Sequence, residues 1–201
     1  MAYAPLKMII SPVVALPVEN VDTDQIIPAR FLKATDKSGF GEKLFFDWRF
    51  SPDGTPDPDF VLNQTGGEAQ ILLAGANFGC GSSREHAAWA LYGYGFRVVI
   101  SSGFADIFRN NAYNNGLLPV EVTPGELHRL FEIYRNAPEA AWSVDLPNQQ
   151  LLTGRDEKPF GFAINPFRKT CLLNGQDLVD YLVERIPVVE QFENQRDNNI
   201  Y

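Results

Sequence analysis

Residues 75–95, GANFGCGSSREHAAWALYGYG, stand near the middle of the chain and decide how the rest of it folds. The five residues before them, 70–74 (QILLA), form a short apolar run that suits a buried strand. In the second half of the stretch, apolar side chains recur at Ala87, Leu91 and Tyr94, which is the i, i+4, i+7 spacing of one helix face. The pattern therefore predicts a strand, a glycine-rich loop and a helix in succession.

Two polar residues of this loop predict where the helix begins. Ser82 and Glu85 have the spacing of a capping box, in which the serine oxygen accepts a hydrogen bond from the backbone N–H of Glu85. The glutamate carboxylate would in turn accept one from the N–H of Ser82. We therefore expect Ser82 to cap the helix.

The same loop has the composition of an anion-binding site. Glycines at positions 75, 79 and 81 allow positive φ angles and a close approach of the backbone to a bound group. Helix N–H groups, the helix dipole and the Arg84 guanidinium would suit a carboxylate or a phosphate, and Arg84 could bind a carboxylate through two parallel hydrogen bonds. Spacing alone also fits an ordinary strand-to-helix turn whose polar residues only cap the helix.

Length and composition indicate one globular domain, residues 1–201. No apolar run approaches the about 20 residues of a membrane helix, and the first residues lack the pattern of a secretory signal. We therefore expect a cytoplasmic protein with no membrane partner. With 25 acidic and 17 basic residues, the net charge of −8 argues against nucleic acid as a partner.

The two cysteines, Cys80 and Cys171, limit the metal chemistry of this chain. An iron–sulfur cluster usually takes three or four cysteines, and no CxxC motif is present. We expect the chain to bind neither a cluster nor a metal ion by itself. Cys80 suits a tight loop better than the role of a nucleophile, because the one candidate base, His86, lies on the following helix.

An Asx-rich segment, residues 20–24 (NVDTD), precedes the central strand. This composition favours side-chain-to-backbone turns over helix or strand. Asp22 and Asp24 could be metal ligands or acid–base carboxylates, although turn formation is the simpler role. Residues 34–63 then form a long connection rich in Gly, Pro and Asp, which we expect its aromatic side chains to hold against the core.

The remaining elements follow from hydrophobic periodicity and from capping signals. Strands are expected within 8–16, which holds one or two, and at 96–101 and 117–122; residues 142–164 alternate as antiparallel strands do. Helices are expected from 104 to before Gly116, after the TPGE cap at 123–126, from Asn165 to Asn174, and at 177–185. His128 falls outside its helix's apolar stripe, so it should face solvent. Residues 188–201 are polar with weak periodicity, and we expect a mobile or partner-docked tail.

Four segments carry a resemblance to a known family. They are NVDTDQIIPARFL (20–32), NFGCGSSREHAAWAL (77–91), SGFADIFRNN (102–111) and INPFRKTCLLNG (164–175). Together and in this order they resemble the small subunits of 3-isopropylmalate dehydratase, which are counterparts of the swivelling domain of aconitase. The resemblance implies an α/β fold with three layers, β/β/α, that closes over an iron–sulfur active site in a separate large subunit.

The resemblance also implies a reaction and a division of work. The family isomerises 2-isopropylmalate to 3-isopropylmalate through isopropylmaleate, a step of leucine biosynthesis. A 4Fe–4S cluster is expected in the large subunit, and the substrate is a small dicarboxylate. Removing a proton and removing a hydroxyl are separable tasks, so the two subunits can share them.

By match to the family motifs, individual residues receive roles. Ser82 would be the base, acting as an alkoxide, and Arg84 would hold a substrate carboxylate. Ser83 would bind substrate, and Asp24 would be a carboxylate of the catalytic site. Arg30 and Lys33 lie before the position where aconitase carries a further substrate arginine, and they are expected to bind substrate.

Other functions remain compatible with the sequence. A related aconitase-type dehydratase acting on homocitrate- or methylmalate-type substrates would share the motifs. A free-standing anion- or nucleotide-binding module could use the same loop, although the chain lacks GxGxxG and Walker spacing. A purely structural subunit would share the fold but would not need Ser82 and Arg84 to converge. Gln176 departs from the family, whose members often have an apolar residue there.

Overall fold

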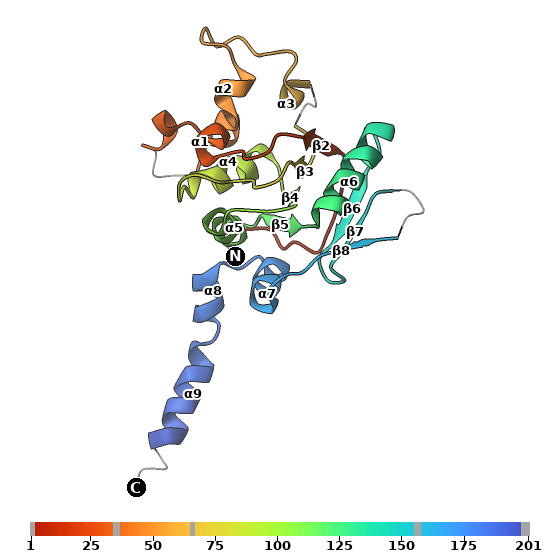
Figure 1. Cartoon of the computed structure of the whole chain (residues 1–201). Helices are drawn as coiled ribbons and strands as arrows, with labels where there is room; N and C mark the ends of the chain where they lie inside the picture. The colour runs from red at the N-terminus through yellow and green to blue at the C-terminus, as the bar shows by residue number, and fades with distance from the viewer. Residues whose placement is uncertain (1–2, 34–36, 65–66, 155–157, 198–201) are drawn as a thin grey trace.

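Two four-stranded sheets form the body of the computed structural model, which describes residues 3–33, 37–64, 67–154 and 158–197 (Figure 1). The antiparallel sheet has the order β1 (Met8–Ser11), β6 (Trp142–Asp145), β7 (Gln150–Leu152), β8 (Phe160–Gly161). The parallel sheet has the order β2 (Val13–Leu16), β3 (Ile71–Ala74), β4 (Val98–Ser101), β5 (Leu118–Glu121). The apolar segment 8–16 is therefore two strands, and Pro12 separates them into different sheets.

The parallel sheet is the middle layer because its side chains are buried on both faces. Along β3, Ile71 and Leu73 join the core beneath the antiparallel sheet, whereas Leu72 and Ala74 join the core beneath the helices. Strands covered on both faces have continuous apolar sequences, as QILLA has. The helical layer consists of α4 (His86–Tyr94) and α5 (Asp106–Asn114). The three-layer β/β/α architecture that the resemblance implies is confirmed.

Helix α6 (Pro124–Asn136) begins where its sequence predicts. The Thr123 oxygen accepts from Glu126 N at 3.3 Å, and the Glu126 carboxylate accepts from Thr123 N at 2.8 Å. The apolar face of α6 packs into the core between the sheets, and His128 on the other face is exposed as expected. A local capping box and an amphipathic stripe are sufficient to predict this helix.

The long connection is held by its aromatic side chains, as expected, in the parts that the structure describes. A 3₁₀ turn at Ala29–Phe31 precedes it. The connection contains a 3₁₀ turn at Gly41–Lys43 and helix α2 (Phe46–Arg49), and it ends in helix α3 (Val61–Gln64). Phe40 and Phe45 are fully buried, and Trp48 stacks on Phe45 with 5.2 Å between ring centroids. The connection therefore forms part of the core over α4.

The C-terminal segment holds three helices, α7 (Pro166–Asn174), α8 (Leu178–Val183) and α9 (Ile186–Asp197). Asn165 caps α7, and Gly175 ends it in the left-handed region with φ of 67°, both as predicted. Residues 188–197, expected as a tail with weak periodicity, are helical. They contain strong helix formers such as Glu190 and Gln191 and no glycine or proline. Figure 1 shows α8 and α9 extending away from the body.

Gln176 is buried just after α7, where it lies against the start of the chain. The Tyr3 hydroxyl donates to the Gln176 carbonyl oxygen, and Asn174 Nδ2 donates to Gln176 Oε1 at 3.2 Å. Within the described ranges, no helix combines the length and the apolar character that a membrane crossing needs.

Candidate active site

The Asx-rich segment and the glycine-rich loop lie side by side and exchange backbone hydrogen bonds. Asn20 N donates to Ala76 O at 2.9 Å, and Gly79 N donates to Val21 O at 2.7 Å. Further on, Thr23 N donates to Cys80 O at 2.9 Å. Two motifs about 60 residues apart in sequence are thereby joined along their length.

The Asx-rich segment contains one turn of helix, so the expectation of a turn without helix was wrong in part. Helix α1 (Thr23–Ile26) begins at Asp22, whose Oδ1 accepts from Asp24 N at 2.7 Å and from Gln25 N at 2.9 Å. The Gln25 side chain accepts from Asp22 N at 2.8 Å and completes a capping box. Asp22 is therefore the helix cap, and the side chain of Asp24 takes no part in the capping.

Thr23 contacts Ser82 at three atoms. Thr23 Oγ1 lies 3.2 Å from Ser82 Oγ, accepts from Ser82 N at 3.2 Å, and can donate to Ser82 O at 3.2 Å. Thr23 is buried, whereas Ser82 is exposed. The serine hydroxyl thus contacts a buried threonine, while Ser82 as a whole residue is exposed.

Asp24 and Arg84 form an ion pair between Oδ1 and Nη1 beside this contact. The side chain of Arg84 is 19% exposed and that of Asp24 is 54% exposed. Successive residues of α1 therefore contact alternate residues of the loop, Thr23 at Ser82 and Asp24 at Arg84. The contacts of α1 thus join Asp24 to the loop that carries Ser82 and Arg84, and the catalytic and binding roles of these residues stay predictions.

The capping box predicted for Ser82 and Glu85 is wrong. Helix α4 begins at His86, and its N-cap Glu85 makes no side-chain capping bond. The Glu85 carboxylate instead accepts from Asn115 Nδ2 at 2.9 Å and from Trp89 Nε1 at 3.3 Å. Asn115, at the end of α5, also accepts from Lys37 Nζ at 2.8 Å. The Glu85 carboxylate therefore bonds with Asn115, which folding brings beside it, and not with the neighbouring N–H of Ser82.

Two of the three glycines of the loop pack against other parts of the protein on the side where a Cβ would stand. A Cβ at Gly75 would overlap with the carbonyl oxygen of Val18, and one at Gly79 would overlap with the Phe108 ring. Gly79 and Gly81 do have positive φ angles, of 75° and 90°. The bends are as predicted, but the space beside Gly75 and Gly79 is filled by the protein itself.

Ser83 is exposed, and its backbone is held by a residue that sequence reasoning missed. Asn111 Nδ2, from α5, donates to Ser83 O at 3.4 Å. Asn111 lies in the family segment SGFADIFRNN, but the motif does not show that its partner is Ser83.

Cys80 Sγ donates to Asn20 O at 3.3 Å, and His86 packs on Trp89 with ring centroids 4.4 Å apart. These contacts support the loop role of Cys80.

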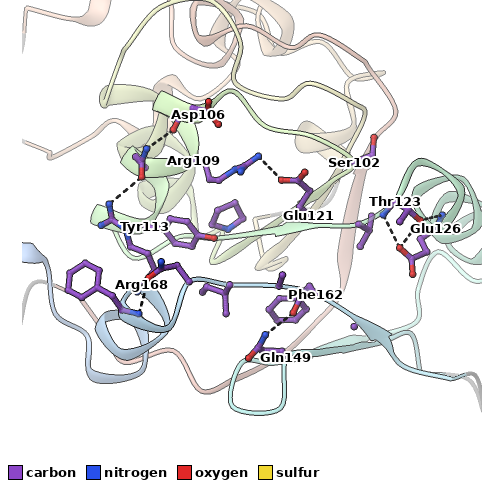
Figure 2. Close-up of a pocket in the computed structure, with 18 of the residues that line it drawn as sticks. Ser102, Asp106, Arg109, Tyr113, Glu121, Thr123, Glu126, Gln149, Phe162 and Arg168 are labelled. Carbon is purple, nitrogen blue, oxygen red and sulfur yellow. Dashed lines mark hydrogen bonds and ion pairs between the residues drawn. The ribbon is translucent and has the colours of Figure 1, made fainter.

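A large cavity of the described structure lies away from these residues. It has a volume of about 1510 Å³ and opens between α5, the ends of β4 and β5, and the start of α7 (Figure 2). Two arginines that line it are paired: Arg109 Nη2 lies 2.6 Å from Glu121 Oε2, and Arg168 Nη1 donates to Asn114 Oδ1 at 2.6 Å. Neither the α1 turn nor the Ser82 loop lines it. The candidate site is therefore separate from this cavity.

Comparisons with known proteins agree with this arrangement of motifs. Residues 12–125 match the family described as the Aconitase C-terminal domain. The 3-isopropylmalate dehydratase small subunit of Christiangramia forsetii is 55% identical over 92% of this chain and 90% of its own length. The chain belongs to the family of 3-isopropylmalate dehydratase small subunits. The Cytophaga hutchinsonii small subunit is 56% identical, with 91% of each chain covered.

A solved structure extends the agreement to the fold of these small subunits. The crystal structure of 3-isopropylmalate dehydratase (leuD) from Methanocaldococcus jannaschii superposes with a TM-score of 0.67 at 27% identity. The match covers 92% of this chain and 98% of that one. The similarity therefore includes nearly the whole dehydratase subunit.

Two predicted substrate-binding residues of this dehydratase subunit are not brought to Ser82. The Arg30 guanidinium forms a two-pronged pair with Asp47, in which Nη1 donates to Oδ2 at 3.0 Å. This pairing holds the pKa of the Asp47 carboxyl below its usual range. Lys33 is exposed beyond the 3₁₀ turn. The contacts of the described residues do not join either side chain to Ser82 or Arg84, so both roles stay predictions.

Proposed function

We propose that this chain is the small subunit of a 3-isopropylmalate dehydratase, which isomerises 2-isopropylmalate to 3-isopropylmalate through isopropylmaleate. The observation that carries the proposal is the pairing of α1 with the glycine-rich loop. It joins the exposed residue Ser82 to Thr23 and pairs Arg84 of the same loop with Asp24. The names of relatives that share half of its sequence support the same reaction.

In this proposal Ser82 moves the proton. The reaction removes a proton from a carbon next to a carboxylate, which requires a base within hydrogen-bond reach of that proton. Ser82 is an exposed residue, so a substrate can approach it from outside. A serine is a very weak acid, so its anionic form needs hydrogen-bond donors and positive charge around it. Arg84 supplies the positive charge two residues away.

Arg84 binds a substrate carboxylate in the same proposal. A guanidinium has five N–H donors in a planar fork. Asp24 engages the Nη1 end, so the fork is already oriented before substrate arrives. Asp24 is more than half exposed and can share the arginine with a substrate carboxylate or yield to it. Ser83, exposed beside them, would add a hydroxyl contact to the same substrate.

The site requires a second surface, which we propose is the large subunit. Ser82, Ser83 and Asp24 are all exposed, whereas proton removal from carbon is favoured where water is excluded. The described residues do not fit an iron–sulfur cluster: they contain no group of three or more His, Cys, Asp or Glu side chains that could hold a metal ion. We place the 4Fe–4S cluster in the large subunit, where it would act as a Lewis acid on the substrate hydroxyl.

The proposed function is tested with the complex of this chain and its candidate large subunit. Formation of the conjugated alkene from 2-isopropylmalate is followed by absorbance, with homocitrate and methylmalate as alternative substrates. We expect turnover of 2-isopropylmalate, and none by either chain alone. Preference for another substrate would assign the chain to a related dehydratase.

Ser82→Ala tests the role of the base in that complex. Turnover should fall at least about 100-fold, the usual scale of general-base catalysis, while substrate binding changes little. Because Ser82 does not cap α4, the melting temperature should stay close to that of the parent. Assembly is checked by gel filtration, and Ser83→Ala serves as the neighbouring control, with its effect expected mainly on KM. Turnover of Ser82→Ala within a few-fold of the parent would contradict the assignment.

A further inference from the structure

We infer that Thr23 is a positioning residue for Ser82 and that its hydroxyl donates a hydrogen bond to the Ser82 oxygen when this oxygen is anionic. The inference rests on the proposed function, in which Ser82 is the base. Its starting point is the set of three contacts, each 3.2 Å long, from Thr23 Oγ1 to the nitrogen, the carbonyl oxygen and the hydroxyl of Ser82.

The number of protons and lone pairs at Thr23 defines what each contact can be. A threonine hydroxyl has one proton to donate and two lone pairs that accept. One lone pair of Thr23 Oγ1 accepts from the N–H of Ser82. Its proton can then point either to the Ser82 carbonyl oxygen or to Ser82 Oγ. The Thr23 hydroxyl can therefore donate to either of two oxygens of Ser82, the carbonyl oxygen or Oγ.

The protonation state of Ser82 selects between the two states. A neutral Ser82 can donate its own proton to the second lone pair of Thr23, while Thr23 donates to the carbonyl oxygen. An alkoxide can only accept, so the Thr23 proton rotates to Ser82 Oγ. Hydrogen bonds to an ionised acceptor are roughly twice as strong as neutral ones. Thr23 keeps its proton throughout and stabilises the anion, which lowers the pKa of the serine.

Burial and backbone bonding hold Thr23 in place for this task. Its exposed fraction is 1%, so bulk water cannot take over its hydrogen bonds. Its backbone is fixed at both ends, since Thr23 N donates to Cys80 O at 2.9 Å and Thr23 O accepts from Ile27 N at 3.0 Å. The backbone that carries the hydroxyl is therefore held beside Ser82.

Several charged or titratable groups surround the pair and are part of any pH effect. From α1 and its cap they are Asp22 and Asp24; from the loop they are Cys80, Arg84 and Glu85. Asp22, Asp24 and Glu85 are engaged by backbone N–H groups, by Arg84 and by Asn115 respectively. A Thr23 variant that keeps these groups unchanged therefore isolates the hydroxyl contact.

The test uses Thr23→Val, which has nearly the same shape without the hydroxyl, in the assembled dehydratase. The pH profile of kcat/KM reports the ionisation of the free enzyme's base. We expect kcat/KM to fall about tenfold or more and its acidic limb to move to higher pH, with KM little changed. Thr23→Ser keeps the hydroxyl and should restore both rate and profile to within a few-fold. Thr153→Val, which removes another buried hydroxyl, is the matched control and should leave both unchanged.

The outcomes separate this inference from the proposed function. An inactive Ser82→Ala enzyme together with a Thr23→Val enzyme that behaves like the parent overturns the inference and leaves the base assignment standing. An active Ser82→Ala enzyme overturns the base assignment itself. A rate loss in Thr23→Val without a shift of the acidic limb, and without rescue by Thr23→Ser, shows a merely structural role and overturns the inference. If Thr23→Val does not assemble, Thr23→Ala compared with Thr23→Ser carries the same test.

Discussion

Asp24 and Arg84 show how one residue can prepare another for a ligand. Their pair lies at a partly exposed surface, where an ion pair contributes at most about 1 kcal/mol to folding. The main effect of the ion pair is therefore to orient the Arg84 guanidinium. A guanidinium already held at one nitrogen loses less conformational freedom when it binds a carboxylate, which favours substrate binding.

Arg84→Lys should separate the charge of this residue from its geometry. Lysine retains the positive charge but cannot form two parallel hydrogen bonds, so kcat/KM of the assembled enzyme should fall by more than about tenfold. Circular dichroism and the melting temperature should match those of the parent. Arg135→Lys, on the exposed face of α6, is the matched control. Parent-like kinetics of Arg84→Lys would remove it from substrate binding.

At the scale of elements, the loop is positioned by α1 on one side and by α5 on the other. Phe108 of α5 fills the space beside Gly79, and Asn111 of α5 holds the backbone of Ser83. Asn115, at the end of the same helix, holds Glu85 at the start of α4. The motif segment 102–111 therefore supports the site through the loop backbone, with no side chain of its own at Ser82 among the described contacts.

Gly79→Ala should demonstrate this packing between the loop and α5. The new Cβ would overlap with the Phe108 ring, and alanine would also have to adopt a φ of 75°. Overpacking costs about 1–3 kcal/mol, and the left-handed conformation costs roughly 1 kcal/mol more. Urea unfolding measures the loss of stability.

Gly54→Ala is the matched control for that experiment. Gly54 has a similar φ of 84°, but a Cβ there would meet nothing within 4 Å. Gly54→Ala should therefore lower the free energy of unfolding only by the cost of the left-handed conformation, about 1 kcal/mol. Equal destabilisation by the two substitutions would mean that Phe108 adapts freely and does not fix the loop.

At the scale of the whole molecule, helices α8 and α9 form an apolar projection. Eight large apolar side chains on them are between 47% and 65% exposed: Leu178, Val179, Leu182, Val183, Ile186, Val188, Val189 and Phe192. A standard interface buries about 800 Å² on each partner, which eight such side chains can supply. Four acidic residues and one arginine accompany them between positions 178 and 195. Like charges disfavour pairing with a second copy, so we propose the large subunit, through a basic-rimmed groove, as the occupant.

Val188→Gln combined with Phe192→Gln should weaken assembly with the large subunit by at least about tenfold in Kd, because both side chains are exposed in the isolated chain. Glutamine favours helix, so the melting temperature of the isolated chain should not change. Gln191→Ala, on the same helix, is the control. Titration of the labelled chain with large subunit gives the affinities. Conversion of a dimer of the parent chain into a monomer would instead identify a second copy as the occupant.

The sequence by itself determined the elements whose signals are local. Buried strands such as QILLA, the capping box at Thr123 and Glu126, and the Asn165 and Gly175 limits of α7 are set by residues within a few positions of each other. The ordered family motifs also predicted the three-layer fold and indicated Ser82, Arg84 and Asp24 as site residues. Their catalytic roles stay predictions.

Only the tertiary structure decided which partner each polar group takes. Ser82 could bond locally with Glu85, but its contacts are with Thr23, 59 residues away, and Glu85 bonds with Asn115, 30 residues away. Arg30 likewise pairs with Asp47 and not with the loop. A sequence motif shows which hydrogen bonds are possible among neighbours. Folding brings distant donors and acceptors beside the same groups, where they compete with these neighbours. The hydrogen bonds that form are those compatible with the burial of the core.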